Sequence, residues 1–388
     1  MIKEASLPAL YMGFLAAFVG YAASFAIVLA GLAQMGASDA QVATGLFFAT
    51  LGMGVCSIWL PAMSRIPAAV AWSTPGAAFL ASSHILPGGF AEAVGALICC
   101  AGLIVVTGFV PALGRLVAAI PKPVANALLA GVLLRLCLAP AQALGAEPRL
   151  ILPLMVAWAA GLCWHRLAAM PMTILAFLVV IFVSVDAPAS ALAASGVGLP
   201  HVVPLMPQFS LQGFVSVAIP LYLVTMAGQN IPGFAVLELN GYAVARQPLI
   251  RRTGLVSLLI APFGAIPVNM SAITAAMMSG EDAHRDPARR YWAAIACGVA
   301  YIAIALCSEP VVALASIAPA ELITSVAGLA LIPALVSSLS GAFSTPAKFE
   351  APALTFLFAA SGMTLLGVSG AVWGTLAGVL VWVLKRPR

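Results

Sequence analysis

Apolar runs long enough to cross a bilayer follow one another along almost the entire chain, and no other feature constrains the fold as strongly. Of the 388 residues, 63% are hydrophobic and only 7% are charged, whereas soluble globular proteins carry roughly a quarter charged residues. A helix needs about 20 apolar residues to cross the hydrocarbon core. The sequence therefore predicts an all-α polytopic membrane protein.

Proline, glycine and charged residues interrupt the apolar runs and divide the chain into fourteen predicted transmembrane spans. The spans are residues 7–33, 39–60, 66–83, 87–109, 122–139, 150–164, 170–185, 213–237, 252–264, 265–279, 289–307, 319–339, 349–364 and 369–384. The first run is longer than the core of a signal peptide, so we expect it to be retained as a span.

The positions of Lys and Arg predict how the chain is oriented. If the N-terminus lies in the cytoplasm, fifteen of these residues fall inside, and only Arg135 and Arg149 fall outside. Such a bias is typical of cytoplasmic loops. We expect a multi-pass protein of the bacterial inner membrane with both termini in the cytoplasm. The basic residues form no stripe with interleaved aromatics, so a nucleic-acid partner is not indicated.

The two halves of the chain resemble each other. Residues 120–131 align with residues 317–328 at an offset of 197, and Gly13-Phe14 matches Gly213-Phe214 at an offset of 200. A repeat of seven spans returns upside down because an odd number of crossings ends on the opposite side, and inverted repeats are a transporter architecture. The predicted division is a first seven-span repeat at 1–185, an extracytoplasmic connection at 186–212 and an inverted second repeat at 213–388.

Two predicted spans contain sequences that start a helix in mid-membrane. In the third span, an extended stretch leads into Ser73, Thr74, Pro75 and Gly76, which read as an N-cap with proline in the first turn. In the tenth span, Asn269-Met270-Ser271 forms a similar start. At the offset of 197, Thr74 falls on Ser271.

Two such helix starts that face each other predict a substrate site. Each N-terminus leaves backbone N–H groups unpaired and carries about half a positive charge, so the pair binds an anion without a buried Arg or Lys. The competing interpretation is a pair of proline kinks repaired by Ser and Thr. Because the two interruptions occupy equivalent places in the two halves, we favour the site.

Further candidates lie in the eighth and first spans. Gln229 and Asn230 are adjacent amides within a span, which are costly unless they meet partners or a cavity. Tyr21 and Phe25 lie one helical turn apart and present rings on one face. Aromatic residues on an apolar helix more often serve packing, so Tyr21 and Phe25 rank below the amides.

Acidic residues were weighed as proton carriers and as metal ligands. Glu92 lies early in the fourth span and is the one acid considered for proton coupling; a solvated acid near the headgroups is the equal alternative. Residues 281–286 contain metal-type side chains, but neighbouring arginines indicate a cytoplasmic loop. No phosphate-binding loop, zinc-protease motif or hydrolase motif is present, and we expect no cofactor and no metal.

Three segments together make the sequence similar to the bacterial benzoate–proton symporter family (BenE type). They are residues 226–233, the run from Ala261 through Asn269 to Thr274, and residues 280–292. The family is related to uracil permeases and sulfate-type anion transporters. The resemblance implies a fourteen-span fold with core and gate domains that move by an elevator-like or rocking motion. It also implies that the interrupted third and tenth spans hold the ligand, with the eighth and first spans closing the pocket.

The resemblance carries one departure. Uracil permeases look to have a glutamate in the eighth span and another in the tenth, where this chain has approximately Gly228 and Thr274. A carboxylate at the midplane repels an anionic substrate, so its absence suits an aromatic carboxylate. It leaves the proton carrier unidentified.

The expected function is secondary import of benzoate or a similar aromatic carboxylate with a proton. The expected partners are that carboxylate, the proton and membrane lipids, with a homodimer left open. A nucleobase or an inorganic anion is the alternative cargo. A membrane-embedded enzyme is a more distant alternative, because His84 and His165 fall in loops on opposite sides of the membrane.

Overall fold

The computed structural model describes residues 6–165, 168–184, 196–203, 205–344, 349–365 and 368–385. Within them the chain is mostly helical, with two short two-stranded antiparallel sheets. Eleven residues of the predicted connection 186–212 lie outside the described residues, as do several of the basic residues that predicted the orientation, among them Lys3, Arg166 and Lys348.

The first half of the described chain contains nine helices and one strand. They are α1 (Leu7–Ala22), α2 (Phe25–Gln34), α3 (Asp39–Ser64), β1 (Val70–Trp72), α4 (Thr74–Ala81), α5 (Gly89–Phe109), α6 (Pro111–Ala118), α7 (Lys122–Ala146), α8 (Pro148–Trp164) and α9 (Ala169–Ser184).

The second half opens with one long helical run that contains two π-helical segments. The run comprises α11 (Leu211–Gly213), η2 (Phe214–Ala218), α12 (Ile219–Thr225), η3 (Met226–Asn230) and α13 (Ile231–Leu239). The remaining elements are α14 (Arg246–Ile260), η4 (Ala261–Phe263), β2 (Val268–Met270), α15 (Ala272–Ser279), η5 (Pro287–Arg289), α16 (Tyr291–Ala305), α17 (Ser308–Ile317), α18 (Ala320–Ala342), α19 (Glu350–Ser361), β3 (Thr364–Leu365), β4 (Val368–Ser369) and α20 (Gly370–Leu384).

Six helical runs of the described chain are long and apolar enough to cross a membrane on their own. They are Leu7–Gln34, Asp39–Ser64, Gly89–Phe109, Lys122–Ala146, Leu211–Leu239 and Ala320–Ala342. A seventh follows if η5–α16 and α17, which are bent by 56°, form one span. Several predicted spans fall short of this length because their helices are brief: α4 and α15 have 8 residues each, and α19 has 12.

Several predicted boundaries differ from the observed ones. The ninth predicted span begins at 252, but α14 begins at Arg246. The fifth was expected to end at 139, but α7 continues to Ala146 through Pro140. The first was expected to be continuous, but α1 ends at Ala22 and α2 begins at Phe25. Hydropathy marks apolar length and does not show where the backbone hydrogen bonds change direction.

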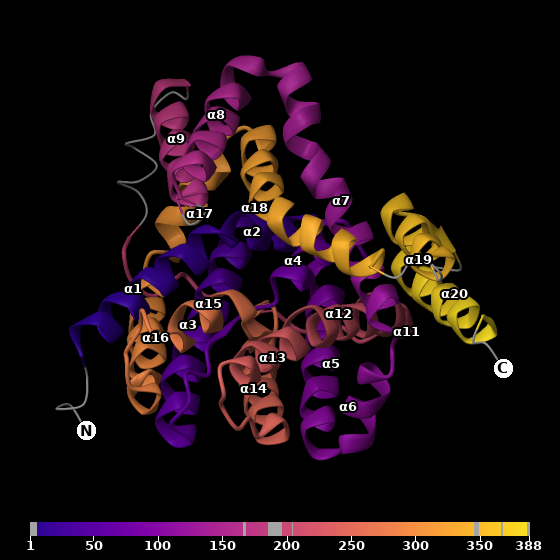
Figure 1. The fold of residues 1–388 in the computed structure, drawn as a ribbon. Coiled ribbons are helices and arrows are strands. Elements are labelled where there is room, and N and C mark those ends of the chain that lie inside the picture. The colour runs from indigo at the N-terminus through magenta and orange to yellow at the C-terminus, as the bar shows by residue number, and fades with distance from the viewer. Residues whose placement is uncertain are drawn as a thin grey trace.

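The helices form a compact block and a set of outlying arms (Figure 1). In the block, helices far apart in the sequence lie side by side: α16 packs against α1 and α3, and α14 packs against α5. The arms consist of α8 and α9 at the top of the view and α19 and α20 at the right. Helices α7 and α18 pack extensively against each other and connect the arms with the block.

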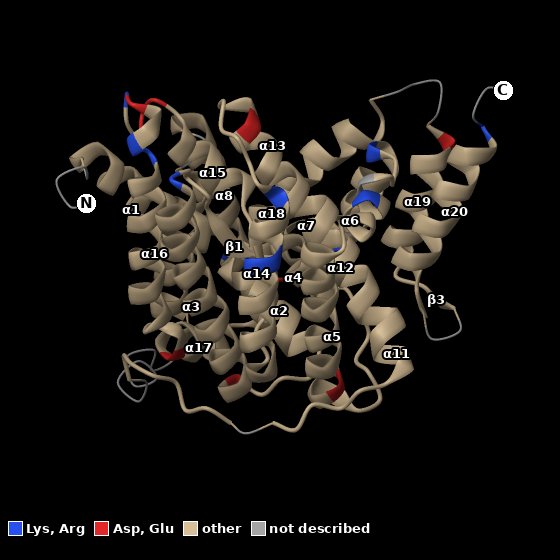
Figure 2. Cartoon of the chain, turned by 90° about the horizontal axis from the view of Figure 1, so that it is seen from below, with Lys and Arg blue, Asp and Glu red and all other residues tan. Residues whose placement is uncertain are grey.

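Charged residues lie mainly toward two opposite edges of the bundle (Figure 2). Most Lys and Arg residues lie toward the edge at which α20 ends. The opposite edge carries acidic residues at the starts of α5 and α17, where Glu92 and Glu309 lie. The segment that leads into α11 also crosses this second edge.

Two interior strands interrupt the helical fold at the centre of the block. Strand β1 pairs with β2 in antiparallel register, with Val70 opposite Met270 and Trp72 opposite Val268. Strand backbone in an apolar interior must find partners for every N–H and C=O. The Ser57 hydroxyl of α3 serves both the N–H (3.2 Å) and the C=O (3.3 Å) of Val70. The Ser257 hydroxyl of α14 does the same for Val268, at 2.9 and 3.2 Å.

These two serines give the first testable prediction. Ser57→Ala or Ser257→Ala leaves a buried N–H and C=O unpaired, which costs about 1–3 kcal/mol per group. Each variant is expected to lower the thermal unfolding midpoint of the purified protein in detergent. Ser64→Ala is the matched control, because the Ser64 hydroxyl bonds only the Leu60 carbonyl of its own helix. Midpoints of all three variants within error of one another contradict the assigned role of Ser57 and Ser257.

Candidate functional site

The two predicted interruptions meet at the strand pair. Strand β1 runs into α4 and strand β2 runs into α15, so both short helices begin at the same crossing. Two backbone bonds tie the junctions together: the Ser73 N–H donates to the Pro267 carbonyl at 2.9 Å, and the Ser271 N–H donates to the Ala69 carbonyl at 3.0 Å. The crossing is the candidate site.

The N-caps are Ser73 for α4 and Ser271 for α15. The equivalent pair is therefore Ser73 with Ser271, 198 positions apart, and the alignment of Thr74 with Ser271 at an offset of 197 was wrong by one residue. The strands and both helices keep the spacing of 198 throughout. The error arose because Ser and Thr are both good N-caps, so the sequence Ser73-Thr74 does not show which residue is outside the helix.

The two helix starts differ in how many N–H groups they offer. At α4, the Ser73 hydroxyl accepts from the Gly76 N–H at 3.1 Å, and Pro75 has no N–H. At α15, the Ser271 hydroxyl accepts from the Thr274 N–H over a longer 3.4 Å. Ala272 and Ile273 are the first residues of α15, whose N–H groups have no acceptor within a helix. The start of α15 is therefore better able to bind an anion than the start of α4.

Ser73 and Asn269 are engaged within the crossing. The Ser73 hydroxyl shares a hydrogen bond of 2.7 Å with the Thr225 hydroxyl. Asn269 is fully buried on β2 opposite Ala71. With its amide oxygen facing the Ser73 N–H (3.3 Å), its nitrogen faces the Met270 carbonyl (3.0 Å). Both side chains support the crossing, so replacing Asn269 is expected to affect the fold as well as any ligand.

The eighth predicted span changes to a π-helix where its two amides lie. Pro232 lacks an N–H and crowds the carbonyl four residues earlier, and the wider π turn of η3 accommodates this defect. The Asn230 amide oxygen accepts from the Met270 N–H at 3.0 Å, so Asn230 supports β2. Gln229 is half-buried, and its side chain makes no hydrogen bond within the described part of the chain. Gln229 is thus the free amide of the pair.

An aromatic cluster joins β1 to the end of α1 and the start of α2. The rings of Tyr21 and Phe25 stack with centroids 5.8 Å apart and planes 3° apart, and Tyr21 also lies 5.2 Å from Trp72. The Trp72 indole N–H donates to the Ser24 hydroxyl at 2.8 Å, and that hydroxyl donates to the Gly20 carbonyl at 3.0 Å. These bonds hold the break between α1 and α2 against β1. Sequence reasoning found Tyr21 and Phe25 but missed both the break and Trp72.

A cavity of about 190 Å³ lies outward of α4, between the block and the arms. Its walls come from the end of α4, η2, α7 and the turn between α19 and α20, including Ser83, His84, Ser216, Met363 and Thr364. No residue of β1 or β2 lines it, so the cavity does not include the crossing.

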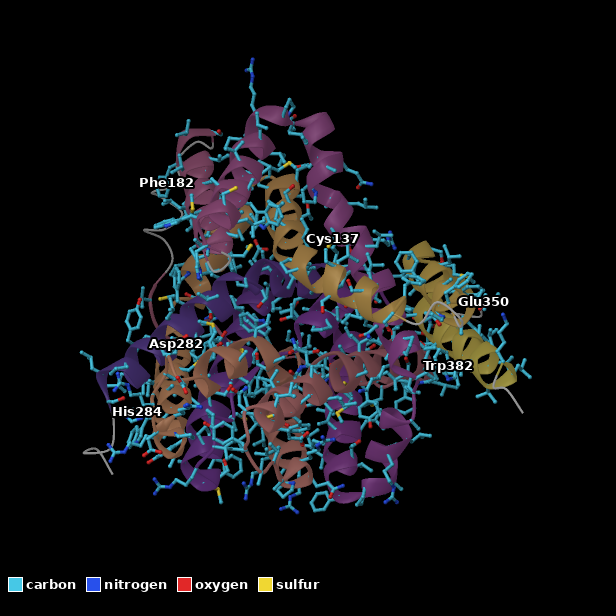
Figure 3. All side chains as sticks on the ribbon, viewed as in Figure 1. Cys137, Phe182, Asp282, His284, Glu350 and Trp382 are labelled. Carbon is cyan, nitrogen blue, oxygen red and sulfur yellow. The ribbon has the colours of Figure 1, made fainter. Side chains whose placement is uncertain are left out.

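Glu92 lies away from the strand crossing. One of its carboxylate oxygens accepts from the Gly88 N–H at 2.7 Å and the other from the Ser210 hydroxyl, so Glu92 links the start of α5 to the segment before α11. Asp282 and His284 lie at the edge of the molecule (Figure 3). The described residues contain no group of three His, Cys, Asp or Glu side chains that could hold a metal ion.

Comparison with known sequences supports one family across nearly the full chain. The model of the family described as "BenE: Benzoate membrane transport protein" matches residues 3–384. The chain is 36% identical to the "Inner membrane protein YdcO" of Escherichia coli over 97% of this chain and 95% of that protein. It is 30% identical to the "Benzoate membrane transport protein" of Acinetobacter baylyi over 100% of this chain and 97% of that protein.

Two solved structures share the fold. The transmembrane domain of the cyanobacterial bicarbonate transporter BicA matches with a TM-score of 0.62 at 13% identity, over 97% of each chain. The structure of SLC26A9 matches with a TM-score of 0.63 at 13% identity, over 99% of this chain and 66% of that one. At these identities the likeness concerns the fold alone.

The two adjacent amides give a prediction about stability. Asn230→Ala removes the acceptor of the buried Met270 N–H and is expected to lower the free energy of unfolding by about 1–3 kcal/mol. Gln229→Ala removes no hydrogen bond and is expected to leave stability near that of the wild type. Thermal unfolding midpoints of both variants in detergent test this. A larger loss in Gln229→Ala than in Asn230→Ala contradicts the assignment.

Proposed function

This chain belongs to the family of benzoate membrane transport proteins, and from that membership we propose that it imports benzoate or a similar aromatic carboxylate together with a proton. The family and its relatives are membrane transporters and not enzymes. The proposed compartment is the bacterial inner membrane, with both termini in the cytoplasm.

One observation carries the choice of an anionic substrate: α4 and α15 both begin at the strand crossing. Helix starts favour negative charge, by roughly 0.3–1 kcal/mol at exposed sites and up to about 2 kcal/mol where partly buried. The residues assigned to the crossing include no Lys and no Arg. A modest attraction of this kind suits a transporter, which must release its substrate as well as bind it.

The neighbouring side chains favour an aromatic carboxylate over the alternative cargoes. Tyr21, Phe25 and Trp72 provide ring surfaces beside β1, and an aromatic pair contributes about 0.5–1.5 kcal/mol beyond simple burial. An inorganic anion has no apolar ring that could pack against these side chains. A nucleobase is disfavoured because Gly228 and Thr274 stand where the related uracil permeases look to carry glutamates.

The proposed architecture is fourteen spans in two inverted repeats, residues 1–185 and 213–388, joined by an extracytoplasmic connection at 186–212. Three local correspondences support it. The strand–helix pair β1–α4 corresponds to β2–α15, and Ser57 corresponds to Ser257 in the hydrogen bonds that each makes to its strand. Helices α7 and α18 are similar in length and pack against each other. The block then corresponds to a core domain and the arms to a gate domain, and transport follows from their relative motion.

Proton coupling is assigned to Glu92. Both of its oxygens accept hydrogen bonds, so protonation of one oxygen competes with the bond from Ser210 or Gly88. Loss of that bond loosens the connection between α5 and the segment before α11. In this proposal the proton acts at the outer edge of the block, away from the bound anion.

The substrate and the coupling are tested in proteoliposomes. Radiolabelled benzoate is expected to accumulate in vesicles that contain the wild-type protein, and to do so faster with an inwardly directed proton gradient. Glu92→Gln is expected to transport benzoate without this stimulation. Uptake no greater than that of empty vesicles refutes the substrate, and an equal proton response in wild type and Glu92→Gln refutes the role of Glu92.

Gln229 is proposed to contact the substrate. Because its amide is unpartnered, Gln229→Ala is expected to weaken benzoate binding at least about ten-fold, the lower end for a lost hydrogen bond to a charged group. Isothermal titration in detergent measures the affinity. The matched control is Gln34→Ala, because the Gln34 amide bonds the Ser83 carbonyl on the protein surface. Equal affinities of the two variants remove Gln229 from the site.

A further inference from the structure

Two buried hydroxyls without a hydrogen-bond partner among the described residues lie near the start of α15. They belong to Thr274 on α15 and Tyr301 on α16. Thr274 is 1% exposed and Tyr301 is fully buried. Folded proteins pair the large majority of such groups, because an unmade bond in the interior is costly. An unpaired set at one place indicates a ligand that supplies the missing partner.

Thr274 and Tyr301 approach the same point on α1. A Cβ atom added at Gly20 would lie 2.8 Å from the Tyr301 hydroxyl oxygen and 3.0 Å from the Thr274 methyl group. Glycine at position 20 therefore allows α1 to pack directly against the Tyr301 hydroxyl and Thr274. The Cys297 thiol, one helical turn earlier on α16, lies beside the Tyr301 hydroxyl. A thiol is only a weak hydrogen-bond partner.

The position of Thr274 places this contact beside the helix start. Thr274 lies in the first turn of α15, next to Ala272 and Ile273, whose N–H groups have no acceptor within the helix. Hydroxyl and backbone donors thus lie around one helix end. A carboxylate accepts up to about four hydrogen bonds on its two oxygens and donates none, so it can accept from both hydroxyls and from the backbone N–H groups.

We propose that Tyr301 is a further substrate-binding residue, whose hydroxyl acts with that of Thr274 to bind the carboxylate of the substrate at the start of α15. The proposal rests on the proposed function and extends it to α16, which neither the sequence nor the crossing indicated. In it, Gly20 allows α1 to approach both residues, because a side chain at this position would displace the Tyr301 hydroxyl.

The buried tyrosine Tyr222 provides a matched control. The Tyr222 hydroxyl shares a hydrogen bond of 2.6 Å with the Thr107 hydroxyl, so Tyr222→Phe removes a partnered hydroxyl from a buried tyrosine. Tyr301→Phe removes an unpartnered one. The two substitutions delete the same atom, and they are expected to act in opposite ways on stability and on binding.

The test measures benzoate affinity by isothermal titration and the ligand-free unfolding midpoint in detergent. Tyr301→Phe is expected to weaken benzoate binding at least about ten-fold, the range of a hydrogen bond to a charged group. Its ligand-free midpoint is expected to stay level or rise, because the substitution removes an unsatisfied polar group. Tyr222→Phe is expected to keep the wild-type affinity and to unfold at a lower temperature. Thr274→Val and Gly20→Ala are expected to weaken binding as Tyr301→Phe does.

The outcomes separate the two proposals. If the wild-type protein binds benzoate and the affinity of Tyr301→Phe is within two-fold of the wild-type affinity, the assignment of Tyr301 is overturned. The proposed function is then unaffected. A lower ligand-free midpoint in Tyr301→Phe, with unchanged affinity, assigns the residue a structural role and also overturns the inference. Wild-type protein that binds no benzoate overturns both.

Discussion

Backbone polar groups in the hydrocarbon interior must be paired within the protein, and the centre of this fold depends on that requirement. Helices α4 and α15 each begin directly after a strand, and a single strand cannot pair its own backbone N–H and C=O groups. The chain meets the cost by pairing β1 with β2 and by adding side-chain partners from three other elements: Ser57 from α3, Ser257 from α14 and Asn230 from η3. The surrounding helices are therefore fixed by the bonds they supply to the crossing.

The same arrangement explains how a chain so poor in charge can recognise an anion. With the strands paired, hydrogen-bond donors remain at the first N–H groups of α15 and on unpartnered side chains of the described residues, among them Gln229, Thr274 and Tyr301. Such donors attract a carboxylate without holding it as a buried Arg would. Aromatic rings at Tyr21, Phe25 and Trp72 then supply apolar contact. In our account, recognition is divided between a backbone end and an aromatic face, and neither needs a formal positive charge.

The sequence predicted the interruptions because their signals are local: an N-cap residue beside proline or asparagine within an apolar run. It predicted the membrane class and the family for similar reasons, and the resemblance to the benzoate transporters is confirmed. The break between α1 and α2 could not be predicted, because Ala22-Ala23-Ser24 carries no strong signal and the bond from Trp72 decides it. Whether an amide is free or engaged was equally hidden, since Gln229 and Asn230 are neighbours and only the course of η3 separates their roles. Tyr301 had no sequence signal at all, because an aromatic residue in an apolar helix usually indicates packing.

The most direct test of the central claim is the structure of the protein with bound benzoate, at a resolution that places the carboxylate. Our account predicts that the carboxylate oxygens lie within hydrogen-bond distance of the N–H groups at the start of α15 and of the Thr274 and Tyr301 hydroxyls, with the ring beside Tyr21 and Trp72. Benzoate bound instead against an arginine, or held only in the outer cavity beside His84 and Ser216, would contradict it.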